Sequence, residues 1–110
     1  MTNINVKISP SEAARVIEQH ITKSGFTPEK TGSYGNRSPE GREAIMLVFE
    51  KYFMRNSSRA SLSVMIDDLK GYTTVHAVGS GGGQMTLFKF DWGASENFEN
   101  LVEQALRSYV

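Results

Sequence analysis

The residues with the most unusual spacing for chemistry stand in one run, Gly79-Ser80-Gly81-Gly82-Gly83. Backbone N–H groups of a glycine-rich turn can surround a phosphate or a carboxylate. The phosphate-binding loop of nucleotide hydrolases continues with Lys and Ser or Thr into a helix, whereas a strand is expected to follow here. The dinucleotide-binding pattern also fails, because no parallel strand–helix–strand unit surrounds the run. Two interpretations stay open: an anion-binding loop at Gly81, Gly82 and Gly83, or a flexible connection in which glycine tolerates positive φ.

Acid–base, nucleophilic and metal chemistry have few candidate side chains. The two histidines, His20 and His76, lack a third ligand at a recognised spacing. The run Asp67-Asp68-Leu69-Lys70-Gly71 is typical of a hairpin turn, and Asp91 suggests a carboxylate that caps a helix or pairs with an arginine. Cysteine is absent, which excludes thiolate nucleophiles and disulfides. The Gly-x-Ser-x-Gly pattern that presents a nucleophilic serine in hydrolases is also absent. We therefore expect no catalytic residue, no metal site and no cofactor.

The charge balance bears on the class of partner. Twelve basic and twelve acidic side chains give a formal net charge of zero, whereas a protein that coats DNA or RNA usually needs a basic excess. A local surface for single-stranded nucleic acid would combine arginines with aromatic residues; the candidates are Arg37, Arg42, Arg55, Arg59, Tyr34, Tyr52 and Tyr72. They are spread along the chain, so we expect no nucleic-acid partner.

The length and composition predict a single globular domain over residues 1–110. A chain of 110 residues with 39% apolar and 22% charged residues can bury a core without disulfides. The first residues lack the basic region and apolar core of a signal peptide, and no apolar run approaches the roughly 20 residues that span a bilayer. Because cysteine-free small domains favour a reducing compartment, we expect a cytoplasmic protein without membrane contact.

The N-terminal part predicts a strand followed by a helix. Apolar and polar residues alternate from Asn3 to Ile8, as in a half-buried strand. Ser9-Pro10-Ser11-Glu12 then supplies an N-cap, a proline suited to the first helical position and a capping-box glutamate. Gly25 ends the helix, whose apolar residues recur at helical spacing: Ala13, Val16, Ile17 and Ile21.

The middle of the chain predicts strands of unequal strength. The polar segment 27–42 favours a short strand over Lys30–Tyr34 and a loop over Asn36–Gly41. The strongest strand pattern, Glu43–Arg55, is apolar on both faces. Ile45, Leu47, Phe49 and Phe53 share one face, and Met46, Val48, Tyr52 and Met54 share the other. Two further strands follow on either side of the predicted turn, around Leu62–Ile66 and Tyr72–Val78.

The C-terminal third predicts a strand over Gln84–Trp92 and a helix capped by Ser95. Phe88, Phe90 and Trp92 lie on one face of that strand, and the helix has the apolar stripe Phe98, Leu101, Val102, Ala105, Leu106 and Tyr109. The run Gly79–Gly83, followed by Leu87-Phe88-Lys89-Phe90-Asp91-Trp92-Gly93-Ala94-Ser95, resembles a family of short bacterial proteins of unknown function, mainly from Gram-positive bacteria. The resemblance implies a bacterial, intracellular, single-domain protein and brings no activity or functional residue.

Each predicted helix has one apolar stripe that it must bury. The simplest solution places both helices on one face of a mostly antiparallel sheet of about five or six strands, with the order strand, helix, strands, helix. This α+β arrangement resembles the helix-grip and TATA-binding-protein-like architectures, although a fold does not fix a function. The side chains of Met46, Tyr52, Met54 and Met65 would then lie on the open face, unless the segment 27–42 folds over them.

Two hypotheses about function follow. The first is a non-enzymatic binding or protein-interaction domain, which could form a homodimer through the open sheet face or a sheet edge. The second is a small-molecule binder or enzyme with a cavity between sheet and helices, lined by Phe88, Phe90 and Trp92. The absence of a catalytic constellation favours the first.

Overall fold

The protein folds into a five-stranded sheet with two α-helices. The computed structural model describes residues 2–23, 28–53, 58–81 and 94–110, without the side chains of residues 53, 58, 81 and 94–98. The elements are β1 (Thr2–Val6), α1 (Pro10–Lys23), β2 (Glu29–Arg37), β3 (Glu43–Phe53), β4 (Ser58–Asp67), β5 (Thr73–Gly81), α3 (Ala94–Leu106) and a short 3-10 turn η2 (Arg107–Tyr109). The predicted α+β class is confirmed.

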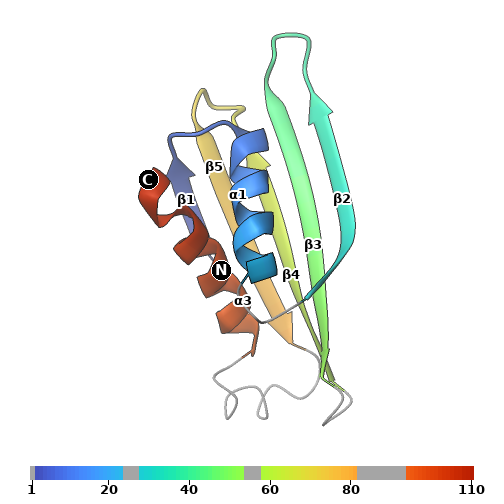
Figure 1. Cartoon of the computed structure of the whole chain (residues 1–110). Helices are drawn as coiled ribbons and strands as arrows, with labels where there is room; N and C mark the ends of the chain where they lie inside the picture. The colour runs from blue at the N-terminus through green and yellow to red at the C-terminus, as the bar shows by residue number, and fades with distance from the viewer. Residues whose placement is uncertain (1, 24–27, 54–57, 82–93) are drawn as a thin grey trace.

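The sheet has the strand order β1-β5-β4-β3-β2, and every neighbouring pair is antiparallel. The strands β2 to β5 form a meander, and β1 joins it at the far edge beside β5. Both helices lie on the same face of the sheet, in front of it in Figure 1, with α3 over β1 and β5 and α1 over β4 and β3. One sheet face is therefore buried under helices, and no element of the described residues covers the other, which we call the open face.

The first helix begins as its sequence predicts. The Ser9 hydroxyl oxygen accepts the Glu12 N–H at 3.2 Å, and the Ser9 carbonyl accepts the Ala13 N–H at 2.8 Å. The first bond satisfies an N–H group that has no carbonyl partner within the helix, and the second is the first backbone hydrogen bond of the helix. The cap fixes the helix phase, so that its buried residues face the sheet: Pro10, Ala13, Ala14, Ile17 and Ile21.

The core lies between the helices and the sheet. Alternate residues of each strand point toward the helices because successive strand side chains point to opposite faces. The central strand supplies Ala60, Leu62, Val64 and Ile66, all fully buried, and they are joined by Leu47, Phe49, Val75, Ala77, Val102, Ala105 and Leu106. The inward residues of β3 match the prediction, so the other apolar face of β3 is left for a different role.

Several predicted boundaries were wrong. The strand β2 is longer than the predicted Lys30–Tyr34, because it pairs with β3 along its whole length. Gly79–Gly81 belongs to β5 and not to a loop, since these residues pair with Leu62, Ser61 and Ala60 of β4. Sheet pairing here outweighs the low intrinsic preference of glycine for strands. Tyr109 is 37% exposed because the α-helix ends at Leu106.

Candidate functional site

The open face of the sheet carries a band of large side chains that crosses all five strands. The strand register places Tyr34, Met46, Met65, His76 and Asn3 side by side on β2, β3, β4, β5 and β1. Tyr34 is 64% exposed, and Met46 and Met65 are each 42% exposed. We call these five residues the open-face band. Met46 and Met65 lie where the sequence predicts, whereas Met54 lies outside the described residues.

A second row extends the apolar surface. Next to the band lie Gly32, Val48, Ser63 and Val78, again as cross-strand neighbours. Neither row contains Asp, Glu, Lys or Arg, although about a quarter to a third of a typical protein surface is charged. Depletion of charge together with enrichment of Met and Tyr is the composition of an interface centre. These two rows of the open face therefore share the composition of an interface centre.

The described residues 28–42 do not cover this surface. They form the edge strand β2 and the turn after it, and eight of the nine β2 residues are exposed. The open-face side of β2 contributes Tyr34 to the band through its pairing with Met46. The interpretation of this segment as a lid over the sheet is therefore wrong, because its backbone is used in pairing with β3.

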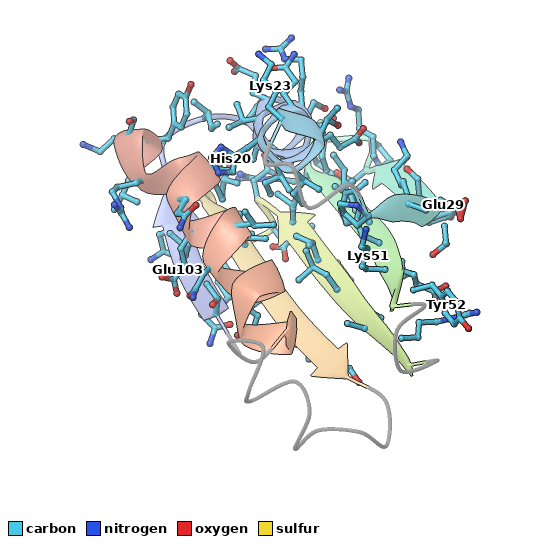
Figure 2. The ribbon with its side chains drawn as sticks, turned by 60° about the horizontal axis from the view of Figure 1, so that its bottom comes forward. His20, Lys23, Glu29, Lys51, Tyr52 and Glu103 are labelled. Atoms are coloured by element: carbon cyan, nitrogen blue, oxygen red, sulfur yellow. The ribbon has the colours of Figure 1, made fainter. Side chains whose placement is uncertain are left out.

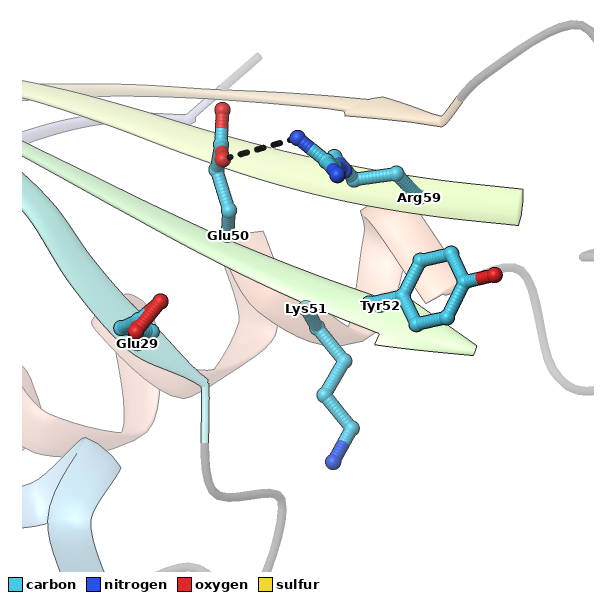
Figure 3. A pocket seen from close by; sticks show the side chains of 5 residues that line it. All are labelled: Glu29, Glu50, Lys51, Tyr52 and Arg59. Carbon is cyan, nitrogen blue, oxygen red and sulfur yellow. Dashed lines mark hydrogen bonds and ion pairs between the residues drawn. The ribbon is translucent and has the colours of Figure 1, made fainter. Parts of the chain in front are cut away.

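One end of the open face holds an arginine, a tyrosine and two glutamates. Arg59 Nη1 lies 3.5 Å from Glu50 Oε1, and its guanidinium carbon lies 5.9 Å from the centre of the Tyr52 ring. Together with Glu29 and Lys51 these residues line a shallow hollow of about 290 Å³ (Figure 3). Tyr52 is exposed on the open face, as predicted. The hollow is a surface feature at the end of β3 and β4, separated from the band by the row that contains Val48 and Ser63, and it is not a cavity between sheet and helices.

The opposite end of the sheet is held by a network around Glu43. Its Oε2 accepts hydrogen bonds from Arg37 Nη2 and from the Ser11 hydroxyl, both at 2.8 Å, and its N–H donates to Asp68 Oδ1 at 2.8 Å. Arg42 Nη1 donates to the Asp68 carbonyl at 3.2 Å. The Arg37 hydrogen bond is the main reason that the pKa of Glu43 lies below its usual value, and the Ser11 hydrogen bond adds to it.

The Glu43 network predicts acid-sensitive stability. A depressed folded-state pKa means that the stabilisation is fully present above the ordinary glutamate pKa of about 4.3 and is lost as the pH falls through the lower folded-state value. We expect the wild-type protein to lose more stability between pH 6 and pH 3 than the Glu43→Gln variant. Urea unfolding at both pH values measures this difference; an identical pH dependence in the two proteins would contradict the prediction.

The arginines considered for nucleic-acid binding do not form one surface. Arg37 and Arg42 lie in the Glu43 network at one end of the sheet, whereas Arg59 lies at the other end of β4. Arg55 lies outside the described residues. The expectation of no nucleic-acid partner stays a prediction.

The histidines and acidic residues are also separated. His20 Nε2 lies 3.4 Å from Gln104 Oε1, between the two helices (Figure 2), whereas His76 Nδ1 is hydrogen-bonded to Asn3 Oδ1 on the open face. Asp67 Oδ1 accepts the Leu69 N–H at 3.2 Å, which is a turn-stabilising bond, as predicted. Among the described residues, no group of three or more His, Asp or Glu side chains is arranged to hold a metal ion.

The glycine-rich run gives one new observation. The Gly79 N–H donates to Glu99 Oε2 of α3 at 2.8 Å, so this donor already binds a carboxylate of the chain itself. Gly81 pairs with Ala60 in the sheet. The other proposed ligand-binding residues lie outside the described residues, and so does Asp91; they are Gly82, Gly83, Phe88, Phe90 and Trp92. Anion or apolar-ligand binding there stays a prediction.

Sequence reasoning missed part of the surface. Met46, Tyr52 and Met65 were identified from strand alternation, but Tyr34, His76, Asn3 and Val78 were not. Their place beside the methionines depends on the register of β2, β1 and β5, and alternation within one strand carries no information on register.

Comparisons with known proteins add one finding. No curated protein and no solved structure matches the chain. Among the described residues, no helix has the length and apolar character required to cross a membrane. A family model does match, over residues 1–110. The chain belongs to this family, which is described as a family of unknown function (DUF6054).

Proposed function

We propose that the protein is a non-enzymatic protein-interaction domain that binds through the open face of its sheet and self-associates as a homodimer. The observation that carries the proposal is the open-face band with its exposed Tyr and Met side chains, because neither the band nor the adjoining row of Gly32, Val48, Ser63 and Val78 contains a charged residue. Exposure of such a surface does not stabilise a monomer, whereas a partner that covers it removes apolar area from water, which is favourable.

The charge balance supports a second copy as the partner. The formal net charge of zero means that two identical chains do not repel each other strongly. The size of the face is also suitable. The five strands have 5, 9, 11, 10 and 9 residues, 44 in all. A spacing of about 4.8 Å between strands and about 3.3 Å per residue gives a face of roughly 700 Å², close to the roughly 800 Å² that each partner of a stable complex buries.

The proposal includes a setting in the bacterial cytoplasm. It is supported by the absence of cysteine from the chain and by the resemblance of its C-terminal third to short bacterial proteins. The alternative, a small-molecule binder or enzyme with a cavity between sheet and helices, depends on Phe88, Phe90 and Trp92, which lie outside the described residues. The interaction proposal rests on described side chains and is preferred for that reason.

Light scattering coupled to size-exclusion chromatography tests the proposal. We expect a molar mass of two chains at protein concentrations of tens of micromolar and above, and a shift toward one chain on dilution. A mass of one chain throughout, up to the high micromolar range, would contradict the homodimer.

A further inference from the structure

We infer that two copies pack back to back through their open faces, about a two-fold axis that runs across the strands along the row Val48, Ser63 and Val78. The inference rests on the proposed function, because it specifies how the second copy is bound. Most homodimers have such an axis and use the same patch on both copies. With the axis in this direction, each strand lies over its own counterpart and runs the opposite way.

The central strand β4 is complementary to itself under this rotation. Its open-face residues are Arg59, Ser61, Ser63, Met65 and Asp67. Ser63 is the midpoint of the five, so the rotation brings Ser63 over Ser63, Met65 over Ser61, and Arg59 over Asp67. A long side chain meets a short one and a cation meets an anion, each twice in the dimer.

The neighbouring strands follow the same rule. On β3, the exposed Tyr52 comes over Ala44 of the second copy and Val48 over Val48, while Met46 comes over Glu50. Glu50 already lies 3.5 Å from Arg59 of its own chain, so its carboxylate is not left unpaired. On β5, Val78 comes over Val78 and the larger His76 over Ser80.

The charged residues are free to make the contact. Arg59 is largely exposed, and a guanidinium has five N–H donors, so it can bind Glu50 of its own chain and Asp67 of the other copy. Asp67 uses Oδ1 for the Leu69 N–H. Within the described part of the chain, Oδ2 has no hydrogen-bond partner. The long arginine side chain also tolerates the rotation of roughly 30° between packed sheets.

The second possible two-fold axis in the plane between the two sheets would bring like charges together. A two-fold axis parallel to β4 would place Asp67 over Asp67, Arg59 over Arg59 and Met65 over Met65. Like charges opposed in an interface are unfavourable, and the two methionines would compete for one space. The charge pattern of β4 therefore selects the axis that runs across the strands.

A charge-swap series tests the inference. Arg59→Asp and Asp67→Arg should each weaken dimerisation about tenfold, because each change replaces two attractive pairs between the copies by two repulsive ones. A tenfold change in the dissociation constant corresponds to about 1.4 kcal/mol. The double variant R59D/D67R should dimerise more tightly than either single variant, because the pairing between the copies is restored with reversed signs. It should stay weaker than wild type, because Glu50 loses its ion pair with Arg59 of the same chain. The matched control is Lys70→Glu, which reverses a charge in the exposed β4–β5 turn, away from the face; it should leave the dissociation constant unchanged. Circular dichroism and thermal unfolding show whether each variant is folded.

A second measurement fixes the axis without changing charge. The chain has no cysteine, so Ser63→Cys introduces a single thiol next to the proposed axis. Packed sheets lie about 10 Å apart, beyond the Cα separation of a disulfide, so a short bismaleimide is the suitable reagent. We expect rapid cross-linking of Ser63→Cys into a dimer and slow cross-linking of Ser33→Cys, which lies on the edge strand β2.

The outcomes separate the two proposals. A wild-type monomer contradicts the homodimer itself. A wild-type dimer overturns only the axis if the single swaps have no effect, if the double variant fails to recover, or if Ser33→Cys cross-links faster than Ser63→Cys. The last result would indicate pairing of β2 edges into one continuous sheet.

Discussion

Replacing Met65 with glutamate is expected to weaken dimerisation at least 100-fold. Met65 lies near the C-terminal end of the central strand β4 and on the open-face band, 42% exposed in the monomer. In a back-to-back dimer the new carboxylate would be removed from water without a cationic partner, and the symmetry would do this twice. A 100-fold change corresponds to about 2.7 kcal/mol. Light scattering or analytical ultracentrifugation over a dilution series measures the dissociation constant.

The matched control for this change is Leu69→Glu. Leu69 is 62% exposed and lies in the turn between β4 and β5, beyond the strand residues that form the proposed interface. Its replacement by glutamate is the same change from apolar to acidic. We expect its dissociation constant to stay within about twofold of the wild-type value, since exposed substitutions outside an interface have small effects. Equal dissociation constants for Met65→Glu and wild type would exclude the open face as the interface. Both variants should fold, because both side chains are exposed.

Replacing Leu62 with alanine is expected to lower the free energy of unfolding by about 3 kcal/mol. Leu62 is fully buried at the centre of the core, with Phe49 and Gly79 as its cross-strand neighbours. The change removes buried methyl groups and leaves a cavity, and such substitutions cost about 2–5 kcal/mol. Gly79 has no side chain that could move into the space, so relaxation around the cavity is limited.

Ser63→Ala is the control on the opposite face of the same strand. Ser63 is exposed in the monomer, and its removal should change the free energy of unfolding by no more than about 0.5 kcal/mol. Urea unfolding followed by circular dichroism, at concentrations below the dimer dissociation constant, gives both values. Similar losses for the two variants would show that the helices do not cover the Leu62 face. The pair therefore tests which face of the sheet forms the core.

Strand alternation predicted the two-faced character of β3 well. Ile45, Leu47 and Phe49 point toward the helices, and Met46 and Tyr52 are exposed on the other side. The helix start at Ser9 was equally predictable, because capping depends on residues within one turn of each other. The extent of β2 and the end of β5 were not predictable in this way, because both depend on pairing with strands far away in the sequence.

The sequence by itself determined the local elements, the absence of thiol chemistry and the presence of apolar side chains in excess of what one core face needs. Only the tertiary structure decided that Tyr34, Met46, Met65, His76 and Asn3 stand in one row, because strand order and register arise from long-range pairing. The sequence alone sets Arg59 and Asp67 four residues on either side of Ser63, whereas the tertiary structure decided that the helices leave this face of β4 uncovered. Residue types follow from the chain alone, whereas a surface exists only after the strands have been placed side by side.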